Sequence, residues 1–213
     1  MKDFDSYILN PTVEQYIADL STHNDPVLKE MEAQASKMEF PIIGPLVGKF
    51  LYQITEISGA TRIFEMGSGF GYSALWFAKA LPENGIIICT DKSEDNYKIA
   101  RGYFNKAGVD MQIRYEVGES LEILRNQNGK FDIILNDIDK EQYPDVIALA
   151  EERLLKGGIM ITDNVLWFGR VITNDTSIST AGVKKFNEQI LSNKNFITTI
   201  IPVRDGIAVS LRN

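Results

Sequence analysis

Residues 62–73 constrain the fold most, because they combine a short apolar run, a glycine turn and the start of a helix. Gly67 ends the apolar run, and residues 72–81 have a helical pattern. Glycine occupies the alternate positions Gly67, Gly69 and Gly71, where the absence of a Cβ lets the backbone approach a bound group or a packed helix closely. This stretch therefore predicts a strand, a turn and a helix, with a flat or polar ligand against the turn.

The spacing of these glycines favours one class of ligand. The turn reads G-x-G-x-G, whereas the dinucleotide fingerprint is G-x-G-x-x-G, and Glu65 precedes the first glycine by two places. A carboxylate at that point repels a pyrophosphate and attracts a cation. S-adenosylmethionine carries an ammonium and a sulfonium group and no phosphate, so the loop favours this cofactor over NAD. The alternative is a tight strand-to-helix turn that binds nothing.

Strands and helices alternate from residue 62 onward, which indicates a doubly wound α/β sheet. Apolar runs predict strands at 62–66, 86–90, 112–117, 131–135 and 158–162. Helical patterns separate them at 72–81, 95–107, 120–126 and 143–155. Two further strands, 196–202 and 206–211, lie close enough along the chain to form an antiparallel hairpin at the end of the sheet. We therefore predict seven strands, most of them parallel.

The residues before the first strand read as three helices, at 11–20, 25–37 and 44–57. We expect a single domain over residues 1–213, in which 1–58 form a helical cover and 59–213 form the cofactor-binding and catalytic core. The only histidine, His23, falls in a polar turn and is interpreted as a solvated residue.

The composition argues for a cytoplasmic protein. No run of about 18 apolar residues exists, and the N-terminus is acidic and lacks the apolar core of a signal peptide. Cys89, the only cysteine, lies in an apolar run and is expected to be a buried strand residue, so no disulfide forms within the chain. The formal net charge of −7 argues against a broad nucleic-acid-binding face.

Acidic side chains follow the predicted strands at the edge where ligands of such sheets bind. Asp91 follows the second strand, where a carboxylate can accept both hydroxyls of a ribose. Glu119 follows the third strand, near the expected place of an adenine amino group, and Asp137 and Asp139 follow the fourth. For any one of these acids, a solvated loop or a helix cap is the alternative.

Asp137, Asp163 and Asn164 offer oxygen ligands from the ends of two neighbouring strands. Oxygen ligation suits Mg²⁺, Ca²⁺ or Mn²⁺, and the absence of nearby histidine or cysteine argues against zinc. Three protein ligands leave coordination positions open, which suggests a chelating vicinal diol or catechol as the substrate. Alternatively, Asp163 and Asn164 only cap a turn.

Lys140 lies three residues after Asp137 and can therefore stand beside the same cation. A neighbouring divalent cation disfavours the ammonium form, so we expect a lowered pKa and a role as general base. The alternative is a surface lysine.

Three motifs resemble one known family, the cation-dependent, S-adenosylmethionine-dependent O-methyltransferases that include the catechol and caffeoyl-CoA enzymes and their small bacterial relatives. The motifs are Glu-Met-Gly-Ser-Gly-Phe-Gly-Tyr-Ser at 65–73, Asp-Ile-Asp-Lys at 137–140 and the segment 157–171. The resemblance extends from about residue 27 to the C-terminus. Two departures stand out: Asp91 is often Glu in this family, and Asn136 stands where an apolar residue is commoner.

The resemblance implies a class I methyltransferase fold, which is Rossmann-like, and a homodimer formed through the N-terminal helices. It also implies that Mg²⁺, or else Ca²⁺ or Mn²⁺, binds Asp137, Asp163 and Asn164, and that Lys140 and Asp137 are catalytic. The implied contacts to S-adenosylmethionine are Glu65, Gly67, Ser68, Gly69, Tyr72, Ser73, Asp91, Glu119, Ser120 and Asp137.

The leading hypothesis is an O-methyltransferase that acts on a metal-chelated hydroxyl of a catechol-like small molecule. Trp167 is a candidate wall for the aromatic ring, with packing of its loop as the alternative. One rival is methylation of a hydroxylated uridine in transfer RNA, for which Arg170, Lys184 and Lys185 would form a basic patch. A non-catalytic S-adenosylmethionine-binding protein ranks lowest, because the metal-ligand candidates and Lys140 are all present.

Overall fold

The computed structural model describes residues 8–213 and contains one seven-stranded sheet. The strands lie in the order β3-β2-β1-β4-β5-β7-β6, and β7 runs antiparallel to both of its neighbours while the others pair in parallel. The predicted fold class is therefore confirmed, including the C-terminal hairpin. The strands are β1 (Arg62–Met66), β2 (Ile86–Asp91), β3 (Ile113–Val117), β4 (Phe131–Asn136), β5 (Leu154–Thr162), β6 (Phe196–Ile201) and β7 (Ile207–Arg212).

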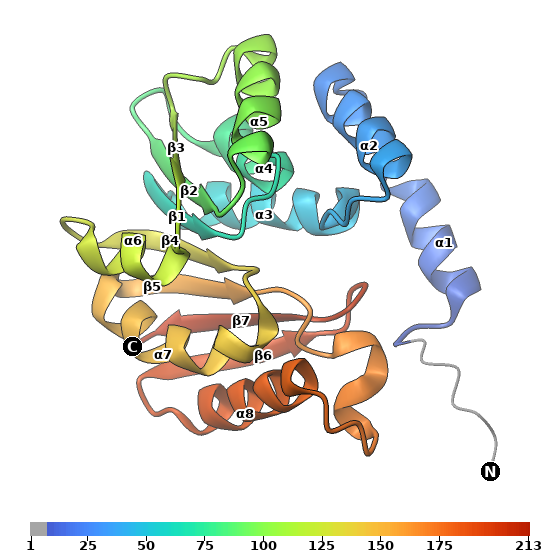
Figure 1. Ribbon diagram of the computed structural model, residues 1–213, viewed down its shortest axis with the longest axis vertical. Helices are drawn as coiled ribbons and strands as arrows, with labels where there is room; N and C mark the ends of the chain where they lie inside the picture. Colours follow the sequence, from blue (N-terminus) through green and yellow to red (C-terminus); the bar gives the residue numbers. More distant parts are fainter. Residues whose placement is uncertain (1–7) are drawn as a thin grey trace.

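Helices cover both faces of the sheet, as Figure 1 shows. Helices α2 to α5 pack on one face, and α6 to α8 pack on the other. The helices are α1 (Pro11–Leu20), α2 (Pro26–Met38), α3 (Gly44–Ser58), α4 (Tyr72–Ala80), α5 (Glu94–Ala107), α6 (Ser120–Asn126), α7 (Tyr143–Arg153) and α8 (Ile178–Ser192). Two short 3-10 helices, η1 (Lys140–Gln142) and η2 (Trp167–Ile172), lie at the carboxyl ends of β4 and β5.

The central strands are buried on both faces, which explains their continuous apolar sequences. Ile63 of β1 points to the α2–α5 side and Phe64 to the α6–α8 side, and both are fully buried. Cys89 is also fully buried, as predicted. None of the described helices is long and apolar enough to cross a membrane.

The three N-terminal helices differ in how they join this core. Leu28 and Met31 of α2 and Val47 and Leu51 of α3 are buried in it, so these two helices cover the sheet as expected. Helix α1, described in full, contributes no buried residue and stands apart from the body of the molecule in Figure 1. Its position leaves an apolar side chain such as Leu20 exposed.

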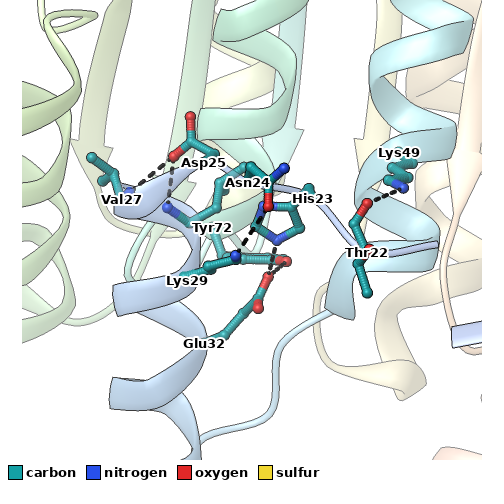
Figure 2. Close-up of polar contacts among 10 residues, drawn as sticks. Thr22, His23, Asn24, Asp25, Val27, Lys29, Glu32, Lys49 and Tyr72 are labelled. Carbon is teal, nitrogen blue, oxygen red and sulfur yellow. Dashed lines mark hydrogen bonds and ion pairs between the residues drawn. The ribbon is translucent and has the colours of Figure 1, made fainter. Parts of the chain in front are cut away.

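The interpretation of His23 as a solvated residue was wrong. Its side chain is only 11% exposed, and Nε2 lies 2.7 Å from Oε1 of Glu32 (Figure 2). The ring also packs edge-on against Trp76 of α4. Asp25 accepts hydrogen bonds from the first backbone N–H groups of α2 and also pairs with Lys79, so the turn that carries His23 is held against α4.

Two boundaries differ from the sequence expectations by more than one residue, and one helix was not predicted. The helix predicted over 143–155 ends at Arg153, and β5 already begins at Leu154. Helix α8 was not among the predicted helices. Its buried face includes Thr180 and Gly182, which interrupt the apolar periodicity that marks a helix in sequence.

Candidate active site

A cavity of about 930 Å³ opens at the carboxyl ends of the parallel strands. Turns after β1, β2, β4 and β5 meet there, together with the loop before α3 and the tip of the β6–β7 hairpin. Eleven of the predicted site residues line this one cavity: Gly67, Ser68, Gly69, Tyr72, Ser73, Asp91, Ser120, Asp137, Lys140, Asp163 and Asn164.

The glycine turn after β1 is built for close packing within the chain. Gly67, Gly69 and Gly71 have φ values of 83°, 53° and 89°, which favour glycine. A Cβ on Gly67 would lie 2.2 Å from the backbone oxygen of Asp137, and one on Gly71 would lie 2.4 Å from the ring of Phe104. The glycines therefore allow β1, β4 and α5 to approach one another, and this approach places the turn beside Asp137.

Glu65 lies beneath this turn and is fully buried. Its Oε1 accepts a hydrogen bond from Ser73, whereas Oε2 has no partner among the residues that the structure describes. Burial raises the pKa of Glu65 to about 7, and nearby Asp137 adds to this rise. A buried, half-satisfied carboxyl group next to the cavity fits a cationic ligand group such as the ammonium of S-adenosylmethionine.

Asp91 and Glu119, the two acids predicted to contact the cofactor's ribose and adenine, have different surroundings. Asp91 lines the cavity, and its Oδ2 accepts the Gly69 N–H at 3.1 Å while Oδ1 accepts from Asn96 at 3.0 Å. Glu119 does not line the cavity; its half-exposed carboxylate lies 3.4 Å from the ammonium of Lys92. Asp91 is therefore fixed in orientation, whereas Glu119 lies outside the cavity wall.

The three predicted metal ligands lie together at the ends of β4 and β5. The backbone N–H of Asp137 donates to Met66 at 2.9 Å, and that of Asp163 donates to Asn136 at 3.1 Å, so sheet-like bonds hold both residues in place. Asn164, at φ 55°, donates from its amide to Asp163 Oδ2 at 3.2 Å. Among residues 8–213 no three His, Cys, Asp or Glu side chains gather as a metal site, so an amide oxygen would complete this set.

The two carboxyl groups of this set disfavour each other's charge. Burial, followed by the charge of Asp137, raises the pKa of Asp163 to about 7. Burial also raises the pKa of Asp137, while Lys140 opposes that rise. Asp163 is buried and Asp137 is partly buried, and two such carboxylates are stabilised when a cation binds between them. The donor set therefore fits a hard divalent cation.

Lys140 is not a surface lysine. Its side chain is 11% exposed, and Nζ donates to Asp137 Oδ1 at 2.8 Å. The ammonium also lies 4.9 Å from the ring centroid of Tyr143 and 5.6 Å from that of Trp167. Helix α8 lies behind η1 at Gly182, where a Cβ would come within 2.3 Å of the Lys140 backbone oxygen.

Sequence reasoning missed part of the cavity wall. Trp167 lines it, as its proposed role as a wall requires, and so do Phe168 and Arg204, which were not predicted. Five non-glycine residues of the described chain have a positive φ, and four of them line the cavity: Asn164, Trp167, Phe168 and Arg204. Backbone strain of this kind concentrates at ligand sites. A sequence shows no clear signal for a positive φ at a residue other than glycine, asparagine or aspartate.

Comparison with known proteins identifies the class to which this fold and site belong. The O-methyltransferase family model matches residues 18–213, so the chain belongs to this family. The chain is therefore an S-adenosylmethionine-dependent O-methyltransferase.

Particular relatives are similar over nearly the whole chain. A catechol O-methyltransferase of Niastella koreensis is 29% identical over 94% of this chain and 96% of its own length. Caffeoyl-CoA O-methyltransferase 2 of Zea mays is 30% identical over 97% of this chain and 85% of its own. The structure of the Bacillus cereus O-methyltransferase in complex with SAH is similar with a TM-score of 0.86, at 27% identity, over 95% of this chain and 97% of that one.

Proposed function

We propose that this O-methyltransferase transfers the methyl group of S-adenosylmethionine to one hydroxyl of a catechol-like small molecule, with a divalent cation bound by Asp137, Asp163 and Asn164. The observation that carries the proposal is the position of Lys140, whose Nζ lies 2.8 Å from Asp137 Oδ1 inside the cavity that the glycine turn also lines. The names of the similar catechol and caffeoyl-CoA enzymes support the choice of acceptor.

In this proposal Lys140 accepts the proton of the reacting hydroxyl when its amine is neutral. Burial and the two ring contacts keep its side chain beside Asp137 and limit access of water. The oxygen then forms a bond to the methyl carbon as the carbon–sulfur bond breaks, and the electron pair of the broken bond stays on sulfur, which gives S-adenosylhomocysteine. A divalent cation bound there, Mg²⁺ or else Ca²⁺ or Mn²⁺, would lower the pKa of the reacting hydroxyl.

In this proposal the other site residues bind the cofactor and the acceptor. Glu65 faces the ammonium of the cofactor, and Asp91 contacts the ribose. The residues of the glycine turn after β1 and Ser120 line the rest of the cofactor-binding region. Trp167 forms a wall for the aromatic acceptor, because it lines the cavity next to Lys140.

The test measures S-adenosylhomocysteine release from caffeate and catechol with Mg²⁺ and with EDTA. We expect EDTA and Asp137→Ala to abolish turnover and Lys140→Ala to lower kcat by about 10²- to 10⁴-fold. Lys98→Ala is the matched control, since Lys98 is exposed on α5 and, within residues 8–213, forms its one ion pair with Asp95. A cooperative unfolding transition in urea shows that each variant is folded. Full activity in EDTA or in Lys140→Ala would contradict the mechanism.

Transfer RNA containing hydroxyuridine is the second acceptor to test. The cations that would bind RNA are Arg170 on η2 and Lys184 and Lys185 on α8, and none of them lines the cavity. Lys184 donates to Thr173, and Arg170 lies over the ring of Trp167. If the protein methylates this RNA and no catechol, the small-molecule proposal is contradicted and transfer RNA is the acceptor.

We also propose that the chain forms a homodimer through its N-terminal helices. Val13, Tyr16 and Leu20 of α1 are 47%, 63% and 68% exposed, and a partner copy would cover this apolar surface. Sedimentation analysis tests the proposal: wild type is expected as a dimer, and Tyr16→Glu with Leu20→Glu is expected to shift it toward monomer. A monomeric wild type would contradict it.

A further inference from the structure

Arg204 at the tip of the β6–β7 hairpin is a cation of the cavity wall to which the proposed reaction assigns no role. The wall contains three cationic side chains in the described chain: Lys92, Lys140 and Arg204. Lys92 pairs with Asp139 at 3.0 Å, and Lys140 pairs with Asp137 at 2.8 Å. Arg204 forms no ion pair with any residue between 8 and 213.

The guanidinium of Arg204 is nevertheless held in place. One nitrogen, Nη1, donates to the backbone oxygen of Ile42 at 2.7 Å, and the group lies against Gly44, whose added Cβ would come within 3.1 Å of Nη1. This contact joins the hairpin to the loop before α3, and both segments line the cavity. A guanidinium has five N–H donors, so a single carbonyl leaves most of them available.

Arg204 lines the same cavity as the metal-ligand candidates Asp137, Asp163 and Asn164. Arg204 also adopts φ 49°, a conformation that is unfavourable for a non-glycine residue and persists where the surroundings fix it. The hairpin thus holds a cation in a strained conformation in the wall of the cavity.

We propose that Arg204 binds a carboxylate carried by the methyl acceptor, so that the preferred substrate is a catechol with an acidic substituent. This inference rests on the proposed function, because it assumes that the two hydroxyls lie at Asp137, Asp163 and Asn164. A planar guanidinium suits a carboxylate, which it can bind through two parallel hydrogen bonds. Arg204 then acts as a specificity-determining residue, and an uncharged catechol lacks the group that it recognises.

The experiment compares 3,4-dihydroxybenzoate with 3,4-dihydroxybenzamide, which has nearly the same shape and no charge. Binding is measured calorimetrically with Mg²⁺ and S-adenosylhomocysteine present, and kcat/KM is measured with S-adenosylmethionine. We expect wild type to prefer the benzoate by about 10-fold or more in both measurements. Arg204→Gln should remove the preference by weakening only the benzoate, and Arg204→Lys should retain part of it. Arg101→Gln, at an exposed position of α5 outside the cavity wall, should behave as wild type.

The outcomes separate this inference from the proposed function. Equal binding and turnover of both compounds by wild type, or an equal loss for both in Arg204→Gln, would overturn the role of Arg204 while catechol methylation stands. A loss of S-adenosylhomocysteine affinity in Arg204→Gln would assign the residue to the carboxylate of the cofactor and would also overturn it. If neither compound is bound or methylated, both the inference and the proposed function fail.

Discussion

The hydroxyl of Tyr72 donates a hydrogen bond to Oε1 of Glu32 at 2.6 Å and so joins the first turn of α4, beside the glycine turn, to α2 (Figure 2). His23 lies 2.7 Å from the same oxygen. Tyr72 is 3% exposed and lines the cavity, so one carboxylate of the helical cover holds a residue of the cofactor region in place.

Removing this carboxylate is expected to destabilise the fold. In Glu32→Ala the buried hydroxyl of Tyr72 loses its acceptor, and we expect the free energy of unfolding to fall by about 1–3 kcal/mol. A double-mutant cycle in urea with Glu32→Ala and Tyr72→Phe should give a coupling energy of about 1 kcal/mol. Glu30→Gln, at an exposed position of the same helix, is the control. A coupling energy near zero would show that the hydrogen bond does not stabilise the fold.

The buried carboxyl group of Glu65 predicts a pH dependence of stability. Its pKa rises from 4.5 to about 7 on folding, so between these values the folded protein keeps a proton that the unfolded chain has released. The free energy of unfolding of the cofactor-free protein should therefore fall as pH rises through this window, by up to about 3 kcal/mol from this group. Asp163 changes stability in the same direction.

Urea unfolding at several values between pH 4.5 and 7.5 tests this expectation. Glu65→Gln cannot ionise, so its slope of stability against pH should be smaller than that of wild type by the contribution of one proton. Binding of S-adenosylmethionine near pH 6 should release a proton in wild type and less in Glu65→Gln, because the ammonium favours the carboxylate. Identical slopes for the two proteins would contradict the assignment.

The two glycines Gly67 and Gly102 should respond in opposite ways to substitution by alanine. At Gly67 the φ of 83° is unfavourable for alanine, and the added Cβ would lie 2.2 Å from the Asp137 backbone oxygen. We expect a loss of about 3 kcal/mol or more. At Gly102, inside α5, nothing lies within 4 Å, so alanine should stabilise the protein by about 1 kcal/mol. Urea denaturation of both variants measures the difference, and a stable Gly67→Ala would refute the packing argument.

The sheet could be predicted from sequence because its strands are short apolar runs separated by clear turns. Residues 62–66 were predicted to the residue, and the strands that end at 90 and 135 were each placed within one residue. The candidate site followed from the same pattern, since parallel strands end at a common edge and Asp137 and Asp163 stand directly after two of them.

Two of the errors, at His23 and Arg204, share a physical cause, which is contact between segments far apart in the chain. His23 is buried because α4, some fifty residues later, supplies Trp76 against its ring. Arg204 reaches the cavity because a hairpin tip meets the loop at Ile42. A polar residue in a turn is usually solvated, and sequence alone does not show which turn a distant element will cover.

The missed helix α8 leads to a prediction about Lys140. Gly182 faces η1 so closely that a Cβ would lie 2.3 Å from the Lys140 backbone oxygen and 2.8 Å from Cα of Glu141. In Gly182→Ala, η1 must therefore move and carry Lys140 away from its position. A shift of about 1 Å in such a residue lowers turnover by about 100-fold, so we expect kcat to fall by about 10- to 100-fold while S-adenosylhomocysteine still binds.

Ala181→Ser, at an exposed neighbouring position of α8, should leave kcat unchanged. Helix propensity alone would make Gly182→Ala more stable by about 1 kcal/mol. A more stable variant with full activity would contradict the prediction, because the reaction would then not depend on the position of η1. A lower kcat at unchanged cofactor affinity would instead show that α8 positions Lys140, because a variant damaged only in folding would lose cofactor binding as well.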